Sequence, residues 1–282
     1  MKQNLDLKYV MGIAIGESRK GYKANDGGPF GAVIIDKQGN IIAASHNHVL
    51  CKNNPTCHAE IETIREACEK LGTHDLSGYI LITSCQPCPM CLCAIAKVGI
   101  KIFYYGCTKE DAGQIGFRDD MMYEYFADMS KSEILNVIQS TKYQDTLSNC
   151  DNSDCLILDQ TGGEVPIILS AKKHSDNFPF GVAEIEAITD AGDKRKTFDL
   201  SGCVMYCKQK PSMLAMAAAI WANIKEIYYM EEKNCFTEID KKLLRYFRTL
   251  NPLEIFNIVS QIEHDECCKV FEEYLEEDKQ RY

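Results

Sequence analysis

The heptapeptide HAEIETI occupies residues 58–64, and the related VAEIEAI occupies residues 182–188, 124 positions later. The same offset relates DLSG at 75–78 to DLSG at 199–202, and KIFYY at 101–105 to KEIYY at 225–229. Upstream the register slips by one residue, because VIID at 33–36 corresponds to LILD at 156–159. Three matches in one register indicate an internal repeat, which determines the architecture before any single motif is interpreted.

Each copy alternates strands and helices. In the first copy, apolar positions predict an opening helix from residue 7, and two β-branched runs, 32–35 and 41–44, flank a Gly-Asn turn typical of a hairpin. The pattern continues with a helix over 58–71, a strand over 79–83, a helix over 88–98 and a strand over 100–105. This alternation predicts an α/β fold with helices packed on a mixed sheet. The polar stretch 146–154 places the boundary between domains 1–150 and 151–282.

Composition excludes several classes of protein. The 282 residues are 45% hydrophobic and 26% charged, as in a soluble globular protein. The longest apolar run, 213–222, is about half of what a bilayer-spanning helix needs, so we expect no membrane partner. A net charge of −10 argues against a general nucleic-acid binder. Fifteen cysteines without a signal peptide suggest a cytoplasmic chain with reduced thiols.

Two short motifs carry metal-binding chemistry. His58 and Glu60 open one predicted helix, and Cys88 and Cys91 lie in the first turn of another, after Pro87. A helix N-terminus favours thiolates, and two thiolates with one neutral imidazole leave the fourth tetrahedral position of Zn²⁺ open. Zinc lowers the pKa of water bound there toward about 7. Glu60 is then expected to act as the catalytic proton carrier rather than as a ligand.

Other interpretations of the cysteines remain possible. A Cys-x-x-Cys pair alone is more often a structural zinc knuckle or a redox pair, and Cys85, Cys88, Cys91 and Cys93 together could form a closed thiolate site. A structural site has no use for a carboxylate two residues from its histidine. The combination with Glu60 therefore favours a catalytic zinc site with His58, Cys88 and Cys91 as ligands.

Residues 8–126 resemble the cytidine deaminase superfamily and, within it, the small zinc-type guanine deaminases and the related guanosine deaminases. The segments that carry the resemblance are GGPFGAVI at 27–34, NPTCHAE at 54–60, TSCQPCPMC at 83–91 and GFRDD at 116–120. The resemblance implies that the fold consists of two tandem three-layer α/β/α domains of cytidine-deaminase type, each with a mixed five-stranded sheet.

The same resemblance implies which residues bind the substrate. Phe30 would line the base pocket, Asn47 would hydrogen-bond the purine, and the Ala59 backbone would hold the ring edge. Asp119 would accept a hydrogen bond from the exocyclic amino group, although a solvated helix start would also explain this residue. The histidines on either side of Asn47, His46 and His48, are expected to be exposed strand-end residues rather than ligands.

The second copy lacks the zinc motif. At the 124-residue offset, Val182 replaces His58, Ser212 replaces Cys88 and Ala215 replaces Cys91, while Glu184 corresponds to Glu60. We interpret this copy as a degenerate, non-catalytic deaminase-like domain. Members of the family are dimers whose C-terminal tail crosses to the neighbouring site, so the chain is expected to form an intramolecular pseudo-dimer, with a homodimer also possible.

The C-terminus ends in KQRY at 279–282, which resembles the tail of bacterial guanine deaminases. We expect a last helix over about 263–278 to dock on the first domain and bring Tyr282 to the mouth of the pocket. A solvated acidic helix with a frayed end is the alternative.

The sequence therefore predicts a zinc-dependent hydrolase that removes an amino group from a small purine. The preferred substrate is guanine, which would give xanthine and ammonia. One alternative keeps the chemistry and changes the substrate to guanosine, cytidine or a tRNA adenosine. The other is a non-enzymatic binding or regulatory protein with a structural zinc ion.

Overall fold

The repeat in the sequence is also a repeat of helices and strands. Helix α2 (Ala59–Leu71) corresponds to α7 (Ala183–Arg195), α3 (Pro89–Lys97) to α8 (Met213–Trp221), and strand β4 (Ile102–Cys107) to β9 (Glu226–Glu231), all at the offset of 124. Upstream, Ala32 pairs with Thr83 in one sheet and Cys155 pairs with Cys207 in the other, which gives an offset of 123 for the first residue of each pair. Both the repeat and its one-residue slip are thus confirmed.

The computed structural model describes residues 5–117, 119–141, 150, 153–161, 167–173, 182–232, 237–252, 255–264 and 266–277. The chain divides into two units. Unit 1 is drawn from the segments Met1–Lys52, Cys57–Asp120 and Leu250–Tyr282, and unit 2 from Asn53–Thr56 and Met121–Thr249.

Unit 1 is built on a five-stranded mixed sheet. Its order is β10 (Ile258–Gln261), β4, β3 (Ile80–Cys85), β1 (Gly31–Ile35) and β2 (Ile41–His46). The hairpin β1–β2 and the pair β1–β3 are antiparallel, whereas β3–β4 and β4–β10 are parallel. This topology confirms the predicted fold class, and the elements lie within a few residues of the expected ranges.

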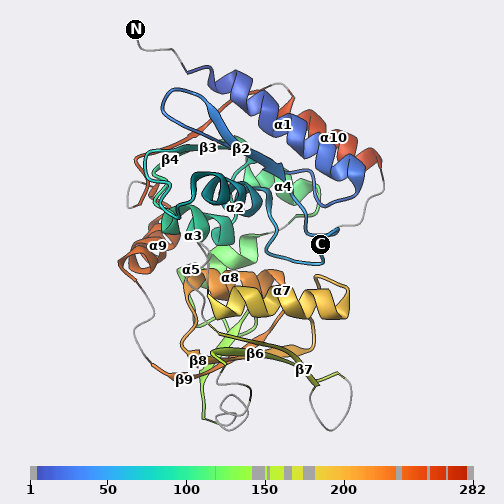
Figure 1. The fold of residues 1–282 in the computed structure, drawn as a ribbon, viewed down its shortest axis with the longest axis vertical. Helices are drawn as coiled ribbons and strands as arrows, with labels where there is room; N and C mark the ends of the chain where they lie inside the picture. Colours follow the sequence, from blue (N-terminus) through green and yellow to red (C-terminus); the bar gives the residue numbers. More distant parts are fainter. Residues whose placement is uncertain are drawn as a thin grey trace. The chain divides into compact units, whose positions relative to one another are not determined.

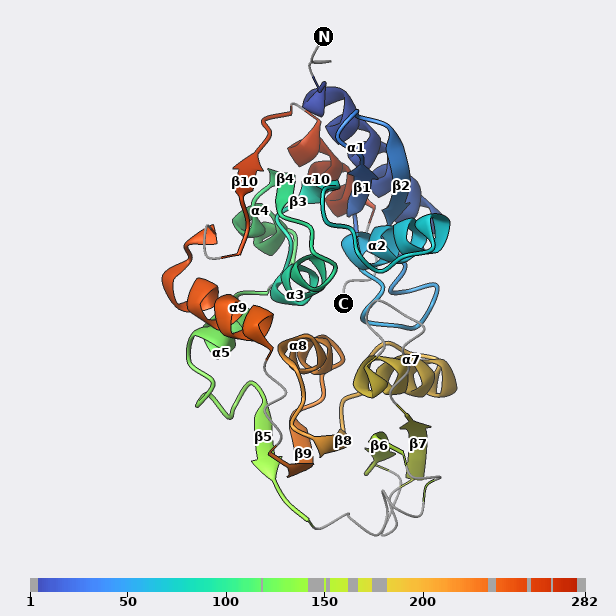
Figure 2. The ribbon, with the colours of Figure 1, turned by 60° about the vertical axis from the view of Figure 1, so that its left-hand side comes forward.

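Helices cover the two faces of this sheet. Alternate residues of β1, Val33 and Ile35, belong to a hydrophobic core with α1 (Leu7–Ala24) and α10 (Cys267–Glu276). Figures 1 and 2 show α1 and α10 side by side, with α2 and α3 on the other side of the strands. On that side, the Thr63 hydroxyl of α2 donates to the carbonyl of Ala32. The short helix α4 (Lys109–Gln114) follows β4.

Unit 2 contains a second five-stranded mixed sheet. Its order is β5 (Asn136–Gln139), β9, β8 (Cys203–Gln209), β6 (Cys155–Asp159) and β7 (Ile167–Lys172). Helix α7 packs on β6 and β7 and contacts α8. The unit also includes α5 (Asp120–Ala127) and α9 (Glu238–Thr249). Within the described residues, the strand directions repeat those of unit 1.

The division of the chain differs from the expected domains 1–150 and 151–282. Strand β5 follows the first copy in sequence but pairs with β9 of unit 2, and β10 follows the second copy but pairs with β4 of unit 1. Each sheet therefore takes its fifth strand from the segment that follows the other copy. A parallel edge strand needs a long connection in any case, so sequence proximity does not dictate which sheet it joins.

The last helix returns to unit 1, as the sequence predicted. Val270, Phe271 and Tyr274 of α10 are buried against α1. At the rim, Arg19 forms ion pairs with Glu266 at 2.6 Å and with Glu273 at 2.8 Å. The docked helix spans 267–276 rather than 263–278. Tyr282 lies outside the described residues.

Among the helices that the structure describes, none combines the length and apolar character that crossing a bilayer requires.

Candidate functional site

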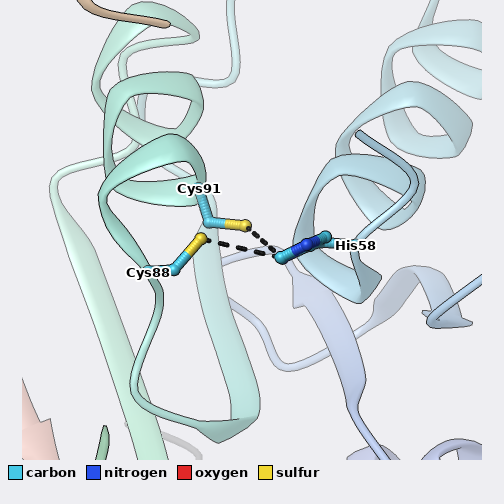
Figure 3. A group of neighbouring side chains, drawn as sticks. All are labelled: His58, Cys88 and Cys91. Carbon is cyan, nitrogen blue, oxygen red and sulfur yellow. Dashed lines mark hydrogen bonds between the residues drawn. The ribbon is translucent and has the colours of Figure 1, made fainter. Parts of the chain in front are cut away.

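Three side chains of unit 1 meet at the N-termini of two helices. His58 is the N-cap residue of α2, Cys88 is the N-cap residue of α3, and Cys91 lies in the first turn of α3. The Nδ1 atom of His58 is 3.7 Å from the Sγ atom of Cys88 and 3.7 Å from that of Cys91. Figure 3 shows both sulfurs turned toward the imidazole ring. The backbone is extended at both N-caps, and neither side chain forms a capping hydrogen bond with its own helix.

The geometry of this group fits zinc. The three ligand atoms lie within 4.8 Å of one another. Bond lengths of about 2.3 Å to sulfur and 2.0–2.1 Å to nitrogen at a tetrahedral angle separate N and S by about 3.6 Å. The observed 3.7 Å needs almost no rearrangement. Two thiolates and one imidazole are donors typical of zinc, and they leave one position for solvent.

The protonation of these side chains is coupled. Burial opposes ionisation of Cys88, but the hydrogen bond from Cys91 and the charge of His58 hold the pKa of this thiol well below its usual value. Burial and the Cys88 thiolate keep the pKa of Cys91 well above its usual value. Burial lowers the pKa of His58, but Cys88, Glu60 and Asp119 together raise it above its usual value. Metal binding therefore releases protons from the group.

Glu60 lies beside the three donors. Its Oε1 atom accepts a hydrogen bond from the Thr83 hydroxyl at 3.1 Å, and its Oε2 atom accepts one from the Cys91 thiol at 3.4 Å. Only 6% of Glu60 is exposed, and this burial raises the pKa of its carboxyl group. A carboxyl group with a raised pKa is suited to carry protons near neutral pH. Thr83, which the sequence analysis did not identify, fixes the orientation of this carboxylate.

The predicted substrate-binding residues also lie in unit 1. Asn47 is fully buried; its Oδ1 atom accepts from the Val49 amide at 3.0 Å, and its Nδ2 atom has no partner among the described residues. Ala59, the first residue of α2, is fully buried. Asp119 is 7% exposed, and burial together with the charge of Cys88 raises the pKa of its carboxyl group to about 7. The expectation of a solvated helix start does not fit this burial.

Phe30 is half-buried and has aromatic neighbours on two elements. Its ring packs edge-on against Phe117 at 4.9 Å and against Phe271 of α10 at 5.8 Å. Helix α10 therefore helps to fix the position of the Phe30 ring through Phe271. Sequence reasoning did not identify Phe117 or Phe271, because the contact joins segments that are far apart in the chain.

The expectation that His46 is an exposed strand-end residue is wrong. His46 is 5% exposed, because its Nδ1 atom contacts Glu17 at 2.9 Å and its Nε2 atom contacts Asp26 at 3.0 Å. These two carboxylates, on α1 and in the turn after it, satisfy a buried imidazole. His48 is half-buried and stacks on His46 with ring centroids 4.2 Å apart.

Comparison with known proteins identifies the domain. The profile of the cytidine and deoxycytidylate deaminase zinc-binding region matches residues 5–107. A guanine deaminase of Bacillus subtilis is 49% identical over 105 residues, which cover 37% of this chain and 67% of the relative. The chain belongs to the cytidine and deoxycytidylate deaminase family. His58, Cys88 and Cys91 all lie within the zinc-binding region of this deaminase.

Two further relatives match part of the chain. A tRNA-specific adenosine deaminase of Agrobacterium fabrum is 38% identical over 107 residues, covering 38% of this chain and 69% of the relative. The X-ray structure of a Bacillus subtilis guanine deaminase is 44% identical, covers 41% of this chain and 73% of that chain, and gives a TM-score of 0.40. The similarity to each of these relatives thus spans less than half of this deaminase.

Proposed function

We propose that this protein is a zinc-dependent hydrolase that converts guanine and water into xanthine and ammonia. The observation that carries the proposal is the group of three donors, His58, Cys88 and Cys91, with the buried carboxylate of Glu60 beside it. Three protein donors are typical of catalytic zinc sites, whereas structural sites use four. When bound, zinc would supply a nucleophilic hydroxide at neutral pH.

Glu60 would move the protons of the reaction. The Thr83 hydroxyl holds Oε1, so Oε2, on the side of Cys91, is the oxygen that takes up and gives back a proton. The carboxylate would receive a proton from the attacking water and pass it to the purine ring nitrogen. After it has given up that proton, the carboxylate would take a second one from the hydroxyl group now bonded to the purine carbon. It would pass this proton to the amino group, which leaves as ammonia while the carbon–oxygen bond becomes the carbonyl of xanthine.

Asn47, Ala59, Asp119 and Phe30 would position the base. Two features support this role: the amide nitrogen Nδ2 of Asn47 has no partner among the described residues, and Asp119 is close enough to the zinc ligands for the charge of Cys88 to raise its pKa. A carboxylate accepts hydrogen bonds from an exocyclic amino group and disfavours a keto oxygen at the same place. Phe30 would stack on the flat base.

Guanine is favoured over other amino-bearing substrates by two observations. The guanine deaminase relative shares more identity with this chain than the tRNA adenosine deaminase relative does. The net charge of −10 also disfavours a polyanionic substrate.

The decisive experiment measures ammonia release from guanine, guanosine, adenine, cytosine, cytidine and a tRNA anticodon stem by the zinc-loaded protein. Turnover of guanine above all others is expected. Preference for the tRNA stem would refute the assignment. Tight zinc binding without release of ammonia from any of these substrates would also refute it.

Unit 2 is proposed to be non-catalytic. Val182 and Ser212 occupy the N-caps of α7 and α8, at the positions of His58 and Cys88, and Ala215 occupies that of Cys91. Ser212 instead caps α8 by accepting a hydrogen bond from the Ala215 amide. Within the described part of unit 2, no three His, Cys, Asp or Glu side chains are close enough to hold a metal ion. The copy would therefore contribute to the fold without binding zinc.

Substitution of Gly27 by alanine is expected to weaken substrate binding. The added Cβ would lie 2.7 Å from the carbonyl oxygen of Asn47 and still closer to its Oδ1 atom, so Asn47 would have to move. Such overpacking costs about 1–3 kcal/mol, and we expect KM for guanine to rise about tenfold or more with zinc content unchanged. Gly16→Ala is the matched control, because nothing lies within 4 Å of its added Cβ. An unchanged KM in Gly27→Ala would argue against a role for Asn47.

Tyr282 is proposed to close the pocket, because α10, only a few residues before it, already supports Phe30 through Phe271. Removal of residues 279–282 should reduce turnover several-fold without loss of zinc. Full activity after this truncation would exclude the role.

A further inference from the structure

Another group of side chains that are close enough to hold a metal ion lies in unit 1, apart from the three donors of the proposed catalytic site. It consists of Cys107, Asp111 and Cys268, which we call the thiol cluster. Their ligand atoms all lie within 4.8 Å of one another, and the Sγ atoms of Cys107 and Cys268 are 3.7 Å apart. The proposed function uses none of these residues.

Three separate elements bring the thiol cluster together, and each is fixed. Cys107 ends β4, where it pairs with Cys85, and its carbonyl accepts from the Gln86 amide at 2.9 Å. Asp111 lies in the first turn of α4. Cys268 lies in the first turn of α10, which is anchored on α1 by its buried residues and by the ion pairs of Arg19. The cluster is therefore already assembled.

The carboxylate of Asp111 is also oriented in advance. Its Oδ2 atom accepts hydrogen bonds from the backbone amide and the hydroxyl of Thr108, both at 2.8 Å, in a capping box at the start of α4. The capping box does not use Oδ1. Carboxylates that bind metals are commonly oriented by hydrogen bonds of this kind. In Asp111 these bonds occupy Oδ2, so Oδ1 would be the oxygen that binds the metal.

The separation of the two sulfurs matches a shared metal ion. Two thiolates bound to zinc at about 2.3 Å with a tetrahedral angle are about 3.8 Å apart. The observed distance is 3.7 Å. Two sulfurs and one carboxylate oxygen suit zinc or a similar soft divalent ion, and do not suit magnesium or calcium.

A third thiol lies next to the thiol cluster. The side chain of Cys267 hydrogen-bonds with that of Cys107. A disulfide between Cys107 and Cys268 would use the same sulfurs but would give no role to the carboxylate of Asp111.

We propose that Cys107, Asp111 and Cys268 bind a second divalent metal ion of the zinc class, which fastens α10 to the end of β4. The two cysteines are 161 positions apart in sequence. A metal ion that closes so long a loop stabilises the fold by reducing the entropy of the unfolded chain. The site would also hold the helix whose Phe271 packs against Phe30.

Cadmium titration of the full-length, reduced, metal-stripped protein tests the proposal, with the ultraviolet thiolate-to-cadmium band as the signal. The wild type should bind two equivalents, and the variant Cys88→Ser/Cys91→Ser should retain one. Adding Cys268→Ser to that variant should remove the remaining equivalent, whereas adding Cys51→Ser, at another exposed cysteine, should not. Adding Asp111→Asn instead, which keeps an oxygen for the capping box, should weaken the remaining site about tenfold or more.

A second readout separates binding from a folding defect. In the Cys88→Ser/Cys91→Ser background, zinc should raise the thermal unfolding midpoint, and the shift should disappear when Cys268→Ser is added, although Cys268 is exposed and its replacement should not unfold the chain. The proposal is overturned if the background variant binds no cadmium, or if Cys268→Ser leaves its binding unchanged. Recovery of a Cys107–Cys268 disulfide from the freshly purified protein would also overturn it.

Discussion

Replacement of Glu60 by glutamine should lower kcat for ammonia release from guanine by about a thousandfold, because positioned proton transfer typically contributes 10²- to 10⁴-fold. Glutamine has nearly the same shape, and its oxygen can still accept the hydrogen bond from Thr83 that orients Glu60. The variant should therefore keep its zinc and its fold. The measurements are steady-state kinetics and zinc content on the same preparation.

Glu62→Gln is the matched control. Glu62 lies on the same helix and is 7% exposed, but it pairs with Lys52 and Arg65 rather than with the zinc ligands. Loss of its charge should lower the unfolding midpoint and change kcat only a few-fold, because a buried ion pair loses one partner. Equal losses of kcat in the two variants, or a Glu60→Gln enzyme that retains full turnover, would contradict the assigned proton transfer.

Replacement of His58 by alanine should remove both zinc and activity, with kcat reduced by more than about 10⁴-fold. Without the metal, the pKa of the attacking water returns from about 7 to 15.7, so the nucleophile is lost at neutral pH. Removal of the imidazole takes away the nitrogen that lies 3.7 Å from each sulfur. The two remaining thiols are too few donors to bind zinc tightly. Zinc analysis and turnover check both effects.

Ser212→Ala tests whether this loss is specific to the first copy. Ser212 occupies the position in α8 that Cys88 occupies in α3. Its replacement should cost about 1 kcal/mol of stability through loss of the helix cap and should leave zinc content unchanged. If His58→Ala retained zinc, or Ser212→Ala lost it, the metal would have to lie elsewhere in the chain.

Much of the fold follows from the sequence because the chain contains the pattern twice. The offset of 124 residues places α7, α8 and β9 at the same positions as α2, α3 and β4. The proposed zinc ligands could also be chosen from the sequence, because they lie at or near the start of helices whose N-terminal signals are local. Pro89 at the start of α3 is one such signal.

Other features depend on contacts between distant segments, which no local pattern reveals. The exchange of β5 and β10 involves strands of only four residues that lie at the sheet edges. The burial of His46 depends on Glu17 and Asp26, which lie 29 and 20 positions away. Glu60 similarly takes its orientation from Thr83, 23 positions away on β3. Such pairings are set by the tertiary fold.

The measurement that tests the account most directly is zinc X-ray absorption on the Cys268→Ser variant loaded with one equivalent of zinc, which confines the metal to the first group of donors. The account predicts two sulfurs, one imidazole nitrogen and one exchangeable solvent oxygen. A third sulfur, or any fourth donor from the protein, would show a closed structural site and would contradict a hydrolytic deaminase.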